Sequence, residues 1–133
     1  MIGGRVLDTS ALVDFATGKS VYSQALVWVA VEQGIVLAVP AAALMAAWAS
    51  LPPSDPDPLD VLLGLPVTVV DPLDERSARE AAKLAAAGVL DPYGCIAAGH
   101  VAWSARHRGW PIVTSEPDLL RALGADLMLE PLP

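Results

Sequence analysis

Three acidic residues stand at points where the chain is predicted to enter a helix. Asp8 directly follows a short apolar strand at residues 5–7, whereas Asp91 and Glu116 open later helices. Open α/β sheets bind ligands beyond the carboxyl ends of their strands, so these side chains can converge there. Clustered carboxylates repel one another unless a cation lies between them, and hard oxygen ligands suit Mg²⁺ or Mn²⁺. The sequence therefore predicts a divalent metal site able to activate water against a phosphodiester.

Other polar residues flank these three acids. Asp118 is a further candidate metal ligand, and three hydroxyl residues could orient water or phosphate oxygens: Thr9, Ser10 and Thr114. Ordinary helix capping remains an alternative for every one of these positions, because Asp, Ser and Thr are preferred N-cap residues and acids offset the helix dipole. Asp14 is expected on the surface, and His100 in the core or at its rim.

The elements that must position these residues alternate along the chain. Strands are predicted at 5–7, 35–39, 67–70, 111–113 and 125–129, and helices at 10–16, 20–33, 40–50, 71–87, 91–108 and 115–123. The proline-rich stretch 52–58 is expected to be a surface loop, followed by a helical turn at 61–65. This alternation predicts a three-layer α/β/α fold with a central, mostly parallel sheet.

Composition narrows the functional classes. The 133 residues fit a single domain spanning 1–133, and 54% of them are apolar. The single cysteine, Cys95, excludes an internal disulfide and favours a cytoplasmic setting. A net charge of -7 argues against broad affinity for nucleic acid but not against a nuclease. The few cations gather at 76–83 and 106–108, where solvated helix faces are the simple interpretation. Four tryptophans could stack on bases, but at their helical spacings they are expected in the core or at a dimer interface: Trp28, Trp48, Trp103 and Trp110.

A membrane segment is not expected. Residues 33–54 carry no charge and are long enough to span a bilayer, but Pro40 interrupts them and Pro52 closes them. No cationic stretch precedes an apolar one at the N-terminus, so a secretory signal is not expected either.

Three segments together resemble the PIN domains of VapC-type toxins. The first, 6–12, resembles the opening strand with its first metal-binding Asp, here Asp8. The second, 91–98, resembles the helix that carries a later acidic ligand, here Asp91. The third, 111–120, resembles the last motif, in which Glu116 stands where Asp is usual. The resemblance covers nearly the whole chain, in order.

The resemblance implies a metal-dependent endoribonuclease of a toxin–antitoxin pair. In such a protein Asp8, Asp91 and Glu116 would hold Mg²⁺ or Mn²⁺ and RNA would be the substrate. Family members commonly form homodimers and pair with a small antitoxin. One departure is marked: the family carries a glutamate in the helix after its second strand, and by spacing this position falls on Ala46. Residues 34–54 contain no acid at all.

Two hypotheses therefore follow. In the first, the chain is an endoribonuclease whose metal affinity and activity are weakened by Ala46 and by the longer side chain of Glu116. In the second, the chain keeps the PIN fold but is not catalytic, and it acts by binding RNA, an antitoxin-like protein or a second copy of itself. A third interpretation, an unrelated small α/β domain with ordinary helix caps, remains open.

Overall fold

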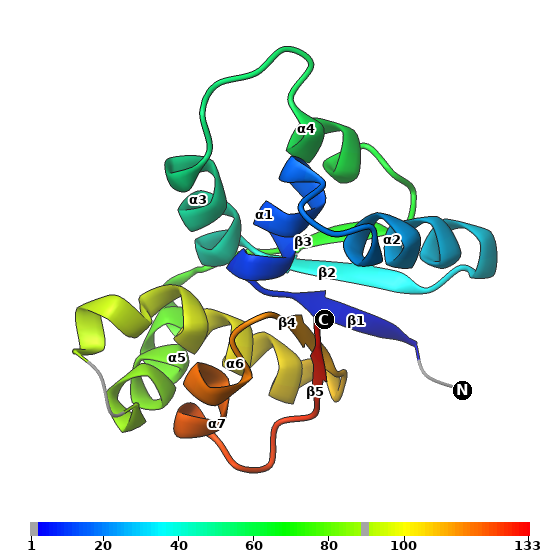
Figure 1. Ribbon diagram of the computed structural model, residues 1–133. Helices are drawn as coiled ribbons and strands as arrows, with labels where there is room; N and C mark the ends of the chain where they lie inside the picture. The colour runs from blue at the N-terminus through cyan, green and yellow to red at the C-terminus, as the bar shows by residue number, and fades with distance from the viewer. Residues whose placement is uncertain (1–2, 89–90) are drawn as a thin grey trace.

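The computed structural model describes residues 3–88 and 91–133, which form a five-stranded sheet and its covering helices (Figure 1). The strands are β1 (Gly4–Leu7), β2 (Val36–Pro40), β3 (Thr68–Asp71), β4 (Ile112–Thr114) and β5 (Leu129–Pro131). The α-helices are α1 (Thr9–Thr17), α2 (Tyr22–Gln33), α3 (Ala41–Ser50), α4 (Pro58–Leu63), α5 (Glu75–Ala87), α6 (Ile96–Arg108) and α7 (Pro117–Leu123), and a 3₁₀ helix, η1 (Pro92–Cys95), precedes α6.

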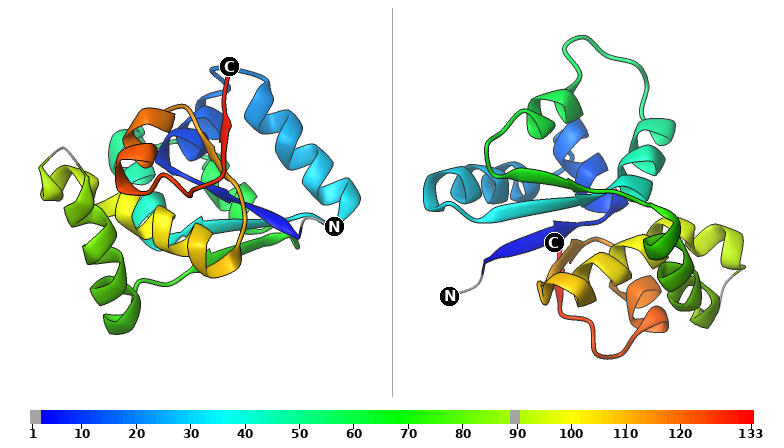
Figure 2. Two further views of the ribbon diagram at one scale, coloured as in Figure 1. Left: turned by 90° about the horizontal axis from the view of Figure 1, so that it is seen from below. Right: turned by 180° about the vertical axis from the view of Figure 1, so that it is seen from behind.

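The sheet has the order β3-β2-β1-β4-β5, and every neighbouring pair is parallel. Helices α1, α2 and α4 lie on one side of it and α5, α6 and α7 on the other (Figures 1 and 2). Helix α3 packs against both α1 and α6. The predicted α/β fold with a mostly parallel sheet is therefore confirmed.

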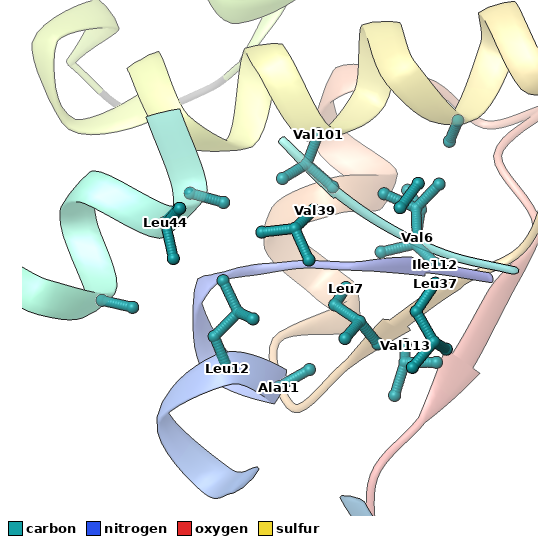
Figure 3. Close-up of a cluster of buried hydrophobic side chains, with 14 of the residues drawn as sticks. Val6, Leu7, Ala11, Leu12, Leu37, Val39, Leu44, Val101, Ile112 and Val113 are labelled. Carbon is teal, nitrogen blue, oxygen red and sulfur yellow. The ribbon is translucent and has the colours of Figure 1, made fainter. Parts of the chain in front are cut away.

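The core lies on both faces of the central strands. Val6, Leu37 and Val39 are completely buried, as expected for parallel strands covered by helices on both sides. Leu12 of α1 approaches the sheet from one face and Val101 of α6 from the other (Figure 3). The short apolar runs of the sequence thus build the layer from which the loops at the carboxyl edge project.

Strand β1 is the topological switch point of the sheet. The chain adds β2 and β3 on one side of β1, then returns to add β4 and β5 on the other. The carboxyl ends of β1 and β4 are neighbours at this point, where ligand crevices of open α/β sheets form. Asp8 follows β1 directly and Glu116 follows β4 by two residues.

Several predicted boundaries were wrong. The helix expected from residue 71 begins at Glu75, because Asp71 ends β3 and accepts hydrogen bonds from Arg108 Nε at 2.9 Å and from Ser104 of α6. Its cap is Asp74, which forms a capping box with Ser77.

Other elements are shifted along the chain. The helix expected over 91–108 is a 3₁₀ turn followed by α6, and the helix expected from residue 20 begins at Tyr22 without a side-chain cap. The last strand, expected at 125–129, lies at Leu129–Pro131. None of the helices in the described ranges is long and apolar enough to cross a membrane.

Candidate functional site at the carboxyl ends of β1 and β4

Asp8 is held at the junction between β1 and α1 by short-range contacts. It is the N-cap of α1, where its Oδ1 accepts hydrogen bonds from the Ala11 backbone N–H at 2.9 Å and from Ser10 Oγ at 2.6 Å. Its side chain is buried, with 7% of the residue exposed. The capping alternative raised from the sequence therefore describes what Asp8 does in this structure, whatever else it binds.

Ser10 and Thr114 join this junction to the one that follows β4. Ser10 Oγ accepts a hydrogen bond from the Ser115 backbone N–H at 2.8 Å, and Thr114 Oγ1 accepts one from the Glu116 backbone N–H at 2.8 Å. The two hydroxyl oxygens lie 3.5 Å apart. Two of the three predicted supporting hydroxyls thus fix Glu116 relative to Asp8, whereas Thr9 donates to the Ala43 carbonyl of α3 at 3.3 Å.

Asp8 and Glu116 line the same cavity, which has a volume of about 220 Å³. Burial raises the pKa of Asp8 above its ordinary value, and the nearby charge of Glu116 adds to this, although hydrogen bonds from Ser10 and Ala11 offset part of the rise. The protein thus binds a proton on Asp8 more tightly than an exposed carboxylate would. Glu116 occupies the N-cap position of α7, makes no side-chain capping bond and is exposed.

The rest of the cavity wall is small and apolar. Ala46 of α3 faces it, and so do three positions of the η1–α6 segment, Gly94, Ala97 and Ala98. By spacing, the position of the family's glutamate falls on Ala46, and in the structure this residue lines the cavity that Asp8 and Glu116 share. Val101, Leu119 and Leu120 complete the apolar part of the lining, and Thr9 and Ser10 are its other polar residues.

Asp91 and Asp118 are placed differently. Asp91 is exposed and caps η1, with its Oδ1 accepting a hydrogen bond from the Tyr93 backbone N–H at 3.2 Å. Asp118 lies in the first turn of α7 and is also exposed. Neither residue lines the cavity. Of the four predicted ligands, Asp8 and Glu116 therefore line this cavity, whereas Asp91 and Asp118 do not.

This arrangement does not fit a hard divalent cation. Mg²⁺ and Mn²⁺ prefer about six oxygen ligands, several of them anionic. The cavity offers two carboxylates, of which one is buried and engaged as a helix cap. Across residues 3–88 and 91–133, no three side chains of the types that bind metals are grouped so that they could share an ion.

The structure also tests the predicted burial of residues that do not line this cavity. Asp14 is not a surface residue: it is buried, and its carboxylate accepts hydrogen bonds from the Ser20 backbone N–H at 3.1 Å and Ser20 Oγ at 2.9 Å. Local sequence gave no signal for this bond, which spans a turn. His100 is in the core as predicted, with no exposed surface. Trp28 and Trp48 are 68% and 40% exposed, so neither of them fills the core, and the dimer-interface part of the prediction stays a prediction.

Solved structures with the same fold exist at low sequence identity. VapBC2 from Rickettsia felis, in a structure described as bound to a DNA fragment from its promoter, matches at 13% identity and a TM-score of 0.68, covering 98% of each chain. This confirms the predicted PIN-like fold. FitAcB from Neisseria gonorrhoeae matches at 17% identity, covering 94% of this chain and 95% of the other, with a TM-score of 0.59.

A third match to the PIN-like fold is FitAB bound to an IR36 DNA fragment, at 14% identity and a TM-score of 0.60, covering 96% of this chain and 94% of the other. No protein-family model and no curated protein matches the chain. At these identities the likeness establishes the fold, and the chemistry has to be argued from the residues that the fold positions here.

Proposed function

We propose that this chain is a PIN-fold protein that does not cleave RNA efficiently and acts by binding a partner protein. The observation that carries the proposal is the composition of the cavity: Ala46, Gly94, Ala97 and Ala98 form its wall where a metal-dependent nuclease needs anionic ligands. Without a bound cation, nothing in the cavity neutralises the charge that develops on a phosphodiester during attack by water.

Exposed apolar side chains support binding as the function. Trp28 and Val21 lie seven positions apart on or beside α2, on the same side of the helix, with 68% and 81% of their surface exposed. Met45 and Trp48 of α3 are 68% and 40% exposed. Large apolar residues left in solvent mark interaction sites, and tryptophan is among the strongest anchors of protein interfaces. The resemblance to VapC-type toxins implies an antitoxin-like protein as the partner, and a second copy of the chain is the other candidate partner.

Metal titration tests the catalytic part of this proposal. Isothermal titration calorimetry with Mg²⁺ and Mn²⁺ is expected to give no micromolar binding to the wild-type protein. The Ala46→Glu variant adds a carboxylate to the cavity and is expected to bind Mn²⁺ more tightly than wild type by at least about tenfold. Met45→Glu adds the same charge one residue away at an exposed position and is the matched control. Micromolar binding by the wild-type protein would contradict the proposal.

The second candidate function is weak endoribonuclease activity. It is favoured by one observation, that Asp8 and Glu116 line the same cavity. The Asp8→Asn variant keeps the helix cap but removes the negative charge, so it separates a structural from a catalytic role. RNA cleavage in Mn²⁺ that disappears in Asp8→Asn would favour the nuclease. Cleavage that is equal in both proteins would point to a contaminating enzyme.

The binding part of the proposal is tested by assembly. Sedimentation of the wild-type protein across a concentration series measures self-association, and Trp28→Ser with Val21→Ser is expected to weaken it if α2 forms the contact between copies. If the protein stays monomeric, an antitoxin-like protein is the remaining candidate partner, and the double variant of Trp28 and Val21 is expected not to bind it. If the variant keeps both self-association and partner binding, α2 is not the interface.

A further inference from the structure

Helices α5 and α6 pack along one another on the face of the sheet opposite α1 (Figures 1 and 2). Side chains of both helices line a groove that is separate from the cavity described above. Its volume is about 390 Å³, within the range of roughly 300–1,000 Å³ typical of small-molecule sites. Its lining residues are Glu80, Lys83, Leu84, Trp103, Arg106 and His107. None of them lines the cavity of Asp8 and Glu116, so this groove is a separate feature.

An aromatic platform forms one wall of this groove. The rings of Trp103 and His107, one helical turn apart on α6, are stacked with centroids 5.0 Å apart and planes 10° from parallel. The orientation of Trp103 is fixed at its edge, because its Nε1 donates a hydrogen bond to Glu80 Oε1 at 2.9 Å. His107 is exposed, so the ring face turned away from Trp103 can stack on a planar ligand. Nucleobases stack on such side chains with little dependence on base identity.

The charges around the platform differ from those of the molecule as a whole. The net charge is -7, yet five of the eight Lys and Arg residues belong to α5 and α6. Arg106 Nη2 contacts Asp126 at 2.5 Å, whereas Lys83 has no carboxylate within ion-pair distance among the described residues. Lys83 is exposed and borders the groove, so it can meet an incoming anion without first breaking an ion pair.

One acidic residue selects among anionic ligands. Glu80 lies in the groove wall beside the aromatic platform, so it repels any anion that brings no hydrogen-bond donor to offset its charge. A nucleotide instead combines a phosphate, a stacking ring and N–H donors on the base edge that a carboxylate can accept. We propose that the α5–α6 groove binds a nucleoside phosphate, either free or within single-stranded RNA, with the base on the outer face of His107, which Trp103 supports from behind, and the phosphate at Lys83.

Fluorescence anisotropy with labelled oligoribonucleotides tests this groove on the intact protein. His107→Ala is expected to weaken binding by about tenfold and His107→Phe to restore it, since stacking needs the ring and not its nitrogens. Lys83→Gln is expected to weaken binding and to reduce the slope of log affinity against log salt by about 0.7, the value for one phosphate contact on a single strand. Arg121→Gln removes one exposed charge from α7, outside the groove, and should leave the slope unchanged.

Competition distinguishes the possible ligands. If GMP or AMP displaces the probe at nucleotide concentrations similar to those of competing RNA, a free nucleotide is sufficient for binding. If only longer RNA displaces it, the ligand is the single strand. Both results support the groove as the binding site. Equal displacement by polyglutamate would overturn the proposal, because it would show simple attraction of anions. Affinity that is unchanged in both His107→Ala and Lys83→Gln, or no measurable binding of any probe, would overturn it as well.

Discussion

His100 should make the stability of this protein fall as the solution becomes more acidic. Its ring has no exposed surface, and its Nδ1 accepts a hydrogen bond from the Ala42 backbone N–H, in the first turn of α3, at 3.2 Å. A protonated ring has no acceptor, so acid removes this bond and leaves a charge in the core. Burial lowers the pKa of His100, and this outweighs the opposing influence of the Pro72 carbonyl and the Asp71 and Asp74 carboxylates.

The sign and size of the effect follow from linkage. The unfolded chain takes up the proton near pH 6.5 and the folded chain only at lower pH, so stability is full above 6.5 and declines as pH falls through the folded pKa. If the ring stays neutral in the fold, lowering the pH from 7 to 5 costs up to about 2 kcal/mol, since each pH unit below the unfolded pKa costs at most about 1.4 kcal/mol.

Urea unfolding followed by tryptophan fluorescence between pH 5 and 7 measures this loss. His100→Asn keeps an acceptor at the position of Nδ1 but does not titrate, so its stability should change much less over this range. His107→Asn, which alters the only other histidine, is exposed and should retain the wild-type slope. If wild type and His100→Asn show equal slopes, the hydrogen bond to Ala42 does not depend on the protonation of His100 and the reasoning fails.

Three other substitutions have defined outcomes. Burial raises the pKa of Asp8, so the protonated carboxyl stabilises the fold below pH 3.8 and this stabilisation is lost as pH rises through the folded pKa. Asp8→Asn keeps the helix cap without the charge and should be more stable than wild type at pH 7 in the same urea assay. Lower stability of the variant would contradict this. Burial alone would raise the pKa of Asp71, but hydrogen bonds from Arg108 and Ser104 lower it below its ordinary value. Arg108→Met should therefore lower the free energy of unfolding by about 1.5–3 kcal/mol at pH 7. It should also remove the loss of stability that Asp71 causes in wild type as pH falls below 3.8. Gly99→Ala should lower the thermal midpoint by the equivalent of about 1–3 kcal/mol, because a Cβ there would lie 2.9 Å from the Ala85 Cβ; an unchanged midpoint would mean that α5 moves freely.

Local patterns were sufficient where a strand and its neighbours are fully buried. The β-branched and apolar runs predicted β1, β2 and β4, and the position of Asp8 and Glu116 after two such runs predicted that they would meet. The spacing that placed Ala46 opposite these acids also holds in space. These successes share one cause, since buried parallel strands appear in the sequence as short runs of apolar and β-branched residues.

Long-range contacts decided the positions that local pattern missed. Asp71 reads as a helix start until Arg108 and Ser104, more than thirty residues away, are seen to hold it at the end of β3. The signal that could have corrected this boundary was Asp74 followed three residues later by Ser77. Asp91 has the sequence of an α-helix start, but it caps a 3₁₀ turn whose next residues, rather than Asp91, face the cavity.

The central place of β1 has a consequence for how the chain matures. One edge of β1 pairs with β2, which begins about thirty positions later in the chain. Its other edge pairs with β4, where the partner of Val6 is Ile112. During synthesis an apolar strand edge therefore stays open until almost the entire polypeptide has emerged, which is the kind of surface that attracts foreign strands and chaperones. A chain truncated before β4 would lack that cover, and we expect it to aggregate rather than to fold as a smaller version of the protein.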